Sequence, residues 1–288
     1  MRPNNTATLL VHCPDKKGIV AIVTDFLLDN NANVISLDQH VDHEENQFFM
    51  RVEWQLDGFV IPKEKIGEYF DTLIAKKLDM NWDLKFYERK PRIALFVSKY
   101  AHCFLDILSR YEAGEWKVEI PMIISNHEKF KYVADRYDIP YHYLPITKAN
   151  KQEQEKKQIE ILKENDIDLI ILARYMQILS STIINVYPNQ IINIHHSSLP
   201  AFAGANPYKA AYTRGVKFMG ATAHYVTADL DEGPIIAQDV IPISHRDSIS
   251  ELKRKGKDIE KMVLAKAVWS HITSNVLTYK NKTVVFDS

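Results

Sequence analysis

Two side chains that could assist attack on a carbonyl group lie side by side in the tripeptide Asn193-Ile194-His195. The apolar run from Ile191 to Ile194 predicts a buried strand, and residues two apart on a strand point to the same face. An amide donor beside an imidazole could hold the oxyanion that forms when a carbonyl is attacked. Both side chains could instead satisfy backbone groups at a turn, and the tripeptide alone leaves that alternative open. His196 is expected on the opposite face of the strand, in a structural role.

Two further clusters contain residues that could serve a reaction. Asp231 lies between two predicted strands, where a carboxylate could orient a histidine or deprotonate water. The Gly233-Pro234 pair nearby is equally typical of an ordinary turn, so this alternative also stays open. The segment from Arg174 to Leu179 follows a short apolar run and could be helix core or the lining of a pocket for a flat ring.

Short apolar runs alternate with helical segments after Lys90-Pro91-Arg92. This alternation predicts an α/β domain in residues 91–288, with a doubly wound, mostly parallel sheet. Ligands bind such sheets at the carboxyl ends of the strands, where Asn193 and His195 are expected. The expected strands are residues 93–97, 120–124, 142–144, 169–172, 191–194, 221–226 and 235–243, and the clearest helices are 129–137, 151–164 and 250–274.

Residues 1–90 predict a separate ferredoxin-like domain of βαββαβ order. Apolar residues recur at helical spacing from Ile19 to Leu27 and again from Ile66 to Ile74. Alternation of polar and apolar residues from Phe48 to Leu56 indicates a strand. The other expected strands are residues 8–12, 33–40 and 82–86.

The composition limits the class of partner. A net charge of −1 argues against nucleic acid or an anionic membrane surface, because both require a concentrated basic field. Cys13 and Cys103 are too far apart in the sequence for a metal motif or a disulfide framework, which predicts a reducing compartment. We find no signal peptide and no apolar stretch long enough for a bilayer, so a cytoplasmic protein is expected.

The three clusters together resemble the folate-dependent formyltransferase family. The resemblance rests on Asn193-Ile194-His195 followed by Ser198-Leu199-Pro200, and on Leu230-Asp231-Glu232-Gly233-Pro234 further along. It implies that Asn193, His195 and Asp231 are the catalytic residues. It also implies a folate pocket, for which the expected lining is Met176, Gln177, Ile178, Leu179, Val226 and Leu230. No cofactor or metal is expected, because the folate is itself the substrate.

The chain is most similar to the members of this family that carry an N-terminal ACT domain and hydrolyse the formyl group. The resemblance rests on the doubled histidine His195-His196, on residues 201–208 and on residues 220–225. The segment His12 to Gly18 is similar to the first strand-to-helix turn of an ACT domain. The resemblance implies an amino-acid effector, and Asp15, Lys17 and Gly18 precede a helix whose backbone amides could bind a carboxylate. The alternative is a plain glycine-containing helix start.

One departure from the family pattern concerns the acceptor of the formyl group. Transformylases of the family hold a substrate phosphate with a glycine-rich loop after the first strand, because bare backbone can approach an anion. Here the segment Ser98 to Phe104 contains no glycine, and Tyr100, His102 and Phe104 are bulky. We therefore expect water as the acceptor, with transfer to an amine as the alternative.

The expected activity is that of a hydrolase of a linear amide C–N bond. It would convert 10-formyltetrahydrofolate to tetrahydrofolate and formate, supplying formate for purine biosynthesis and balancing one-carbon folate pools. Asn193 and His195 would stabilise the oxyanion, while Asp231 would orient His195 and accept the proton of water, directly or through a relay. The resemblance further implies a homo-oligomer.

Overall fold

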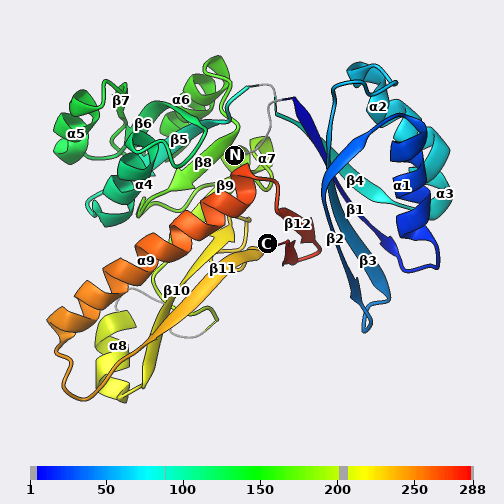
Figure 1. Cartoon of the computed structure of the whole chain (residues 1–288). Coiled ribbons are helices and arrows are strands. Elements are labelled where there is room, and N and C mark those ends of the chain that lie inside the picture. The colour runs from blue at the N-terminus through cyan, green and yellow to red at the C-terminus, as the bar shows by residue number, and fades with distance from the viewer. Residues whose placement is uncertain (1–4, 88, 201–206, 287–288) are drawn as a thin grey trace. The chain divides into compact units, whose positions relative to one another are not determined.

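The computed structural model describes residues 5–87, 89–200 and 207–286 (Figure 1). Contacts divide the chain into two units. The first comprises the residues up to Arg89, Thr273–Leu277 and the chain from Val284 onward, and the second comprises Lys90–Ile272 and Thr278–Thr283. The sequence assigns all of residues 91–288 to the second domain, whereas the contacts place two short C-terminal segments with the first. In one of these contacts, Arg51 Nε donates to the Ser274 carbonyl oxygen at 2.9 Å.

The first unit has the βαββαβ order predicted from the sequence. Its elements are β1 (Thr6–Pro14), α1 (Ile19–Asp29), β2 (Asn33–Asp42), β3 (Gln47–Gln55), α2 (Lys63–Phe70), a π-helical turn (Asp71–Ala75), α3 (Lys76–Leu78) and β4 (Asn81–Phe86). The antiparallel sheet has the order β2-β3-β1-β4, and Figure 1 shows α1, α2 and α3 on one face. Every second residue of β1, among them Leu9 and Val11, faces this layer and packs with Val23 and Phe70.

The second unit contains a seven-stranded sheet of order β11-β10-β9-β8-β5-β6-β7. Its elements are β5 (Arg92–Val97), α4 (His102–Glu112), β6 (Glu119–Ser125), a 3-10 turn (Glu128–Phe130), α5 (Lys131–Arg136), β7 (Tyr141–Tyr143), α6 (Lys151–Glu164), β8 (Leu169–Leu172), α7 (Ser181–Val186), β9 (Ile191–His195), α8 (Pro207–Arg214), β10 (Phe218–Tyr225), β11 (Ile235–Pro242) and α9 (Ile249–Ile272). The strands β5 to β9 run parallel, and β10 and β11 continue the sheet antiparallel. The prediction of a doubly wound, mostly parallel sheet is confirmed.

The order of the strands fixes where a ligand crevice can form. From β5 the chain moves outward to β6 and β7, then returns to β8 on the other side of β5. This reversal places the switch point of the sheet between β5 and β8, and crevices lie outside the carboxyl ends of the strands there. The helix α9 packs along β9, β10 and β11, and α4 packs against α9 (Figure 1).

A C-terminal hairpin, β12 (Val276–Tyr279) and β13 (Lys282–Val285), forms a separate two-stranded sheet that the sequence did not predict. Both strands are only four residues long, and the turn between them is marked by Lys280 with φ of 52°. No helix in the described ranges is long and apolar enough to cross a membrane.

Candidate active site

The end of β9 and the facing part of β10 hold three polar side chains of the site. β9 pairs antiparallel with β10, and the register places Asn193 directly opposite His224 and His195 opposite Thr222. His195 and His224 are buried, with 6% and 2% of their surface exposed, and Asn193 is half-buried. Because directly paired residues project to the same face, the side chains of Asn193, His195 and His224 can meet.

Asp231 reaches these residues from the loop between β10 and β11. Its backbone is left-handed, with φ of 58°, which turns the loop back toward the sheet. Gly233 allows this return, because a Cβ atom there would lie 1.8 Å from the Tyr225 carbonyl oxygen. The Tyr225 amide in turn donates to the Pro234 carbonyl at 2.9 Å. Close approach of two backbone segments therefore accounts for the glycine in the predicted turn.

His195 and Asp231 form an ion-pair geometry. His195 Nδ1 lies 3.2 Å from Asp231 Oδ2. The carboxylate accepts, so the proton of neutral His195 is on Nδ1 and the other ring nitrogen, Nε2, has its lone pair available. Nε2 is buried and has no hydrogen-bond partner among the described residues. A buried polar atom without a partner usually has a functional explanation, and this one lies on the proposed catalytic histidine.

His224 contacts both other members of the site. Its Nδ1 lies 2.9 Å from the Tyr225 carbonyl oxygen, which only accepts, so the proton is on Nδ1. Its Nε2 then accepts from the Asn193 amide nitrogen at 3.2 Å, and the same Nε2 is 3.7 Å from Asp231 Oδ1. The sequence did not assign a role to His224, because only the register of β9 against β10 reveals its position. The signal was its place on a predicted strand following the Asn193 strand.

The electrostatics of the site favour an ionised carboxylate. The hydrogen bond from His195 holds the pKa of Asp231 well below its usual range, and burial opposes it only in part. Asp231 is therefore negatively charged at neutral pH. A fixed negative charge therefore lies beside Nδ1 of His195.

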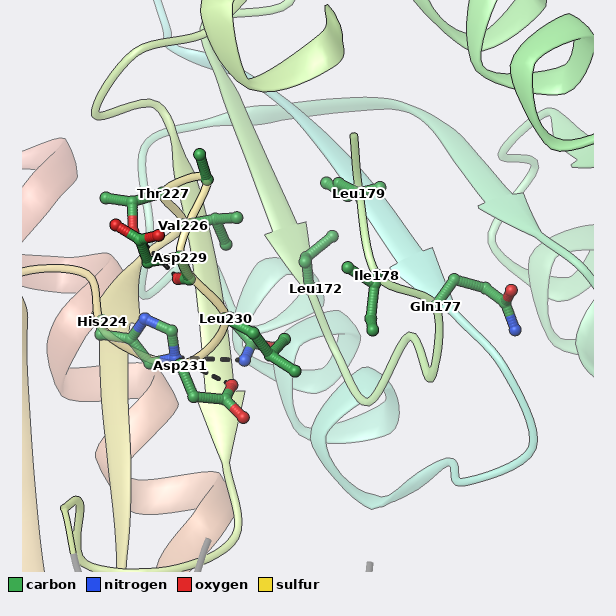
Figure 2. Close-up of a pocket in the computed structure, with 12 residues that line it drawn as sticks. Leu172, Gln177, Ile178, Leu179, His224, Val226, Thr227, Asp229, Leu230 and Asp231 are labelled. Atoms are coloured by element: carbon green, nitrogen blue, oxygen red, sulfur yellow. Dashed lines mark hydrogen bonds and ion pairs between the residues drawn. The ribbon is translucent and has the colours of Figure 1, made fainter. Parts of the chain in front are cut away.

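A cavity opens next to these residues (Figure 2). Its open volume of about 410 Å³ includes the solvent-filled space at its mouth. Its lining is Leu172, Gln177, Ile178, Leu179, Asn193, His224, Val226, Thr227, Ala228, Asp229, Leu230 and Asp231. Figure 2 shows Leu172, Ile178 and Leu179 on one side, with His224 and Asp231 across from them.

The structure brings five of the six predicted folate-binding residues to this cavity. They are Gln177, Ile178, Leu179, Val226 and Leu230. Met176 is not among the lining residues and is 54% exposed. Ile178 and Leu230 are also more than half exposed, although both are apolar. Exposed apolar side chains around a cavity beside polar groups are what a flat aromatic ligand requires.

The segment after β5 differs in part from the prediction. Of the three bulky side chains in this segment, Phe104 is fully buried against Phe130 in the protein core, so it does not border any open space where a second substrate could bind. His102, at the start of α4, donates from Nε2 to Glu260 of α9 at 2.8 Å, and Tyr100 is half exposed. In the sequence motif of residues 201–208, residues 201–206 lie outside the described part of the chain.

In the first unit, Asp15 is half-buried, Lys17 and Gly18 are exposed, and Gly18 starts α1 with φ of 91°.

Two families match the chain. The formyl transferase family matches residues 91–268, and the ACT domain family matches residues 7–60. A formyltetrahydrofolate deformylase of Synechocystis sp. is 53% identical over 283 residues, which cover 98% of this chain and 99% of that protein. The chain belongs to the formyltetrahydrofolate deformylase family.

Solved structures agree with membership of the deformylase family. A formyltetrahydrofolate deformylase from Pseudomonas syringae pv. tomato superposes with a TM-score of 0.94 at 42% identity, covering 99% of this chain and 96% of that one. Glycinamide ribonucleotide transformylase 1 from Symbiobacterium toebii superposes with a TM-score of 0.64 at 27% identity, covering 69% of this chain and 95% of that one. This chain therefore shares about two thirds of its fold with a protein named for transfer to a different acceptor.

Proposed function

We propose that this protein hydrolyses 10-formyltetrahydrofolate to tetrahydrofolate and formate. The observation that carries the proposal is the geometry at His195, whose Nδ1 pairs with Asp231 while its buried Nε2 has no partner among the described residues. The adjoining cavity is lined by apolar residues expected to hold the pterin ring. The products would feed purine biosynthesis and return tetrahydrofolate to the one-carbon pool.

The reaction needs a base, an oxyanion donor and an acid. His195 Nε2 removes a proton from water, and the resulting hydroxide forms a C–O bond to the formyl carbon. The Asn193 amide has a second N–H beyond the one given to His224, and it donates to the developing oxyanion. The C–N bond to the folate nitrogen then breaks, and the His195 imidazolium returns its proton to that nitrogen. Asp231 stays ionised throughout and balances the imidazolium charge.

Water as the acceptor is supported by the side chains at the switch point of the sheet. A phosphate-binding loop there would need backbone N–H groups open to the ligand. Instead, His102 from α4 contacts Glu260 at 2.8 Å, and the Arg174 guanidinium lies 5.1 Å from the centre of the Tyr100 ring. Tyr100 and His102 thus lie in the region that a second substrate would need.

Product analysis tests the proposal directly. Purified protein with 10-formyltetrahydrofolate should release formate and tetrahydrofolate in equal amounts, without any added acceptor. Adding glycinamide ribonucleotide should change neither the rate nor the formate yield. Formylated ribonucleotide as the main product would show a transferase and contradict the proposal.

We also propose that the N-terminal unit binds an amino-acid effector at the start of α1. The support is the left-handed Gly18 and the absence of any side-chain hydrogen bond capping α1, which leave its first amides open to a carboxylate. Asp15 and Lys17 flank this position. Calorimetric titration with single amino acids should show one that binds the full-length protein and loses affinity in Gly18→Val. Binding unaffected by that substitution would place the effector elsewhere.

Self-association is proposed as well. β2 is an edge strand, its first eight residues are exposed, and Val34, Ile35 and Leu37 are each about two-fifths exposed. An exposed apolar edge strand favours pairing with another chain. Light scattering should give a mass above that of one chain, and Leu37→Lys should lower it. A monomer at all concentrations would contradict this.

A further inference from the structure

The residue after the proposed catalytic histidine does not lie where strand alternation placed it. His196 was expected on the opposite face from His195, but the two rings stack with centroids 5.0 Å apart and planes 26° apart. The expectation was wrong because β9 ends at His195, so alternation no longer governs the next residue. The half-buried His196 ring therefore covers one face of the His195 imidazole.

The His196 ring also contacts Tyr208 from α8, with ring centroids 6.1 Å apart and planes tilted by 37°. The Tyr208 hydroxyl donates to Glu260 Oε1 at 2.5 Å. Gly256, one helical turn before Glu260 on α9, makes room for this ring, since a Cβ atom there would lie 2.4 Å from Tyr208. The three rings His195, His196 and Tyr208 thus form a series that ends on α9.

Glu260 is buried and contacts two further side chains besides Tyr208. It is 1% exposed, and its Oε2 lies 2.8 Å from His102 Nε2 and 3.4 Å from Arg174 Nε. Burial alone would raise the pKa of this carboxyl, but the His102 hydrogen bond, the Arg174 charge and the Tyr208 hydroxyl together lower it. His102, Glu260 and Cys103 also lie close enough to surround a metal ion. The cationic Arg174 beside the carboxylate argues against a metal cation there. We therefore interpret this cluster as the group that fixes Glu260, which in turn holds the Tyr208 hydroxyl.

The charges around His196 keep its ring neutral. Burial, the Arg174 guanidinium and the neighbouring His195 lower its pKa to about 4. A neutral ring can stack on His195 when that residue becomes an imidazolium, without a second positive charge beside it. His196 is therefore suited to hold His195 in place and unsuited to compete with it for a proton.

We propose that His196 is a positioning residue for His195, and that Tyr208 and Glu260 hold it in place. The inference rests on the proposed role of His195. A single hydrogen bond to Asp231 fixes one ring nitrogen of His195 but leaves the ring able to tilt about that contact. Stacking on His196 restricts the tilt, so that Nε2 keeps its direction toward the attacking water. Misplacing a catalytic group by about 1 Å can cost on the order of a hundredfold in rate.

Two substitutions at His196 separate positioning from proton transfer. His196→Ala removes the ring that stacks on His195 and should lower kcat by about tenfold or more. The KM for 10-formyltetrahydrofolate should stay within about twofold of the wild-type value. His196→Phe keeps a flat ring without nitrogens and should restore most of kcat. Equal loss in both variants would show that the imidazole nitrogens are needed, and wild-type kcat in His196→Ala would show that the stack has no catalytic role. Either result would overturn the proposal.

A variant of Tyr208 tests whether its contact with Glu260 holds His196 in place. Control variants elsewhere in the same unit show whether any loss of activity comes from a general effect on folding. Tyr208→Phe removes only the hydroxyl that reaches Glu260 and should lower kcat by a smaller factor at unchanged KM. Tyr137→Phe is a matched control, because it removes a hydroxyl-to-carboxylate bond to Glu112 elsewhere in the same unit. His142→Ala on β7 controls for loss of a half-buried histidine. If kcat changes by the same factor in Tyr208→Phe and in Tyr137→Phe, the Tyr208–Glu260 contact does not hold His196 in place.

His195→Ala in the same assay separates this inference from the proposed function. Loss of activity in His195→Ala with normal kcat in a folded His196→Ala variant would overturn the positioning role alone. Normal activity in His195→Ala would remove the proposed mechanism and, with it, the reason for positioning. Circular dichroism and the unfolding temperature of each variant establish that it is folded.

Discussion

The carboxylate of Asp231 is approached by two histidines that differ in the state of their ring nitrogens. His195 donates a hydrogen bond from Nδ1 to Asp231 and leaves Nε2 free for the proposed reaction, whereas His224 donates from Nδ1 to a backbone carbonyl and accepts from Asn193 at Nε2. The two imidazoles are therefore suited to different roles, although both lie next to the Asp231 carboxylate. One is suited to move a proton, and the other to orient the amide that holds the oxyanion.

The proposed catalytic residues should each be indispensable for turnover. Asn193→Ala, His195→Ala and Asp231→Ala should lower kcat by on the order of a hundredfold or more, as loss of an oxyanion donor or its partner does elsewhere. Steady-state kinetics and thermal unfolding of each variant measure this. Asp239→Ala, an exposed carboxylate on β11, is the control. Normal turnover in a folded variant would remove that residue from the mechanism.

His224 should matter through Asn193. In His224→Phe the ring volume stays but the acceptor for the Asn193 amide is lost, so the amide is free to rotate. We expect kcat to fall by roughly tenfold, a value typical of one misoriented polar group, with a smaller change in KM. A kcat within twofold of wild type would mean that Asn193 is held by other contacts.

The low pKa of Asp231 has a consequence for acid stability. A carboxyl whose pKa is depressed on folding stabilises the native state above its ordinary value of 3.8, and the stabilisation is lost as the pH falls below that value. The free energy of unfolding should therefore differ between wild type and Asp231→Asn at pH 6, and the difference should shrink below about pH 4. Chemical denaturation at several pH values measures it. A difference independent of pH would contradict the depressed pKa.

At the scale of elements, the loop between β10 and β11 positions Asp231 by close backbone packing. Gly233→Ala would put a Cβ atom 1.8 Å from the Tyr225 carbonyl oxygen, so the loop must move. We expect at least tenfold lower kcat with the rest of the fold intact, because Asp231 moves with the loop. Gly215→Ala gives a comparison at a left-handed glycine with open space around it. Equal activity in both variants would show that the loop tolerates the shift.

The strands could be predicted from the sequence because each buried strand is a short apolar run between polar turns. Asn193 and His195 were expected on one face for the same reason, since spacing of two within a strand needs no knowledge of its neighbours. His224 was not assigned, because pairing across strands depends on register and register depends on the whole sheet. The stacking of His196 was missed because it lies one residue beyond the strand, where the periodicity ends.

The C-terminal hairpin and the cluster around Glu260 show the same limit. β12 and β13 are too short for periodicity to reveal them. Glu260 lies on a helix rich in charged residues, so nothing in its local sequence distinguishes a buried carboxylate from a solvated one. Its partners come from α4, α8 and the end of β8, which only the folded sheet brings together.

At the scale of the whole molecule, the chain passes between its two units more than once. Residues up to Arg89 belong to the first unit, and Thr273–Leu277 and the segment from Val284 return to it. The chain beyond α9 is held there by Arg51, which donates to the carbonyl oxygens of Ser274 and Thr273. The proposed catalytic residues and the cavity all lie in the second unit.

A fragment that begins at Lys90 should therefore keep the site but lose stability. It retains every residue that lines the cavity, so folate binding measured by fluorescence titration should persist. It also exposes Val276, Leu277 and Phe286, each less than 10% exposed in the full chain, so its unfolding temperature should be lower and its solubility reduced. Full-length protein cleaved at an inserted protease site between Arg89 and Lys90 is the control. A soluble fragment that cannot bind folate would show that the first unit contributes to the pocket.

The path of the chain also decides how the molecule would respond to tension. The described chain begins next to β1 and ends at Phe286, and both belong to the first unit, so the main segment of the second unit, Lys90–Ile272, is inserted between two parts of the first. A pull applied to the two ends is carried first by the first unit and reaches the catalytic sheet only after that unit has opened. The first unit should therefore unfold before the sheet of the second unit is stretched.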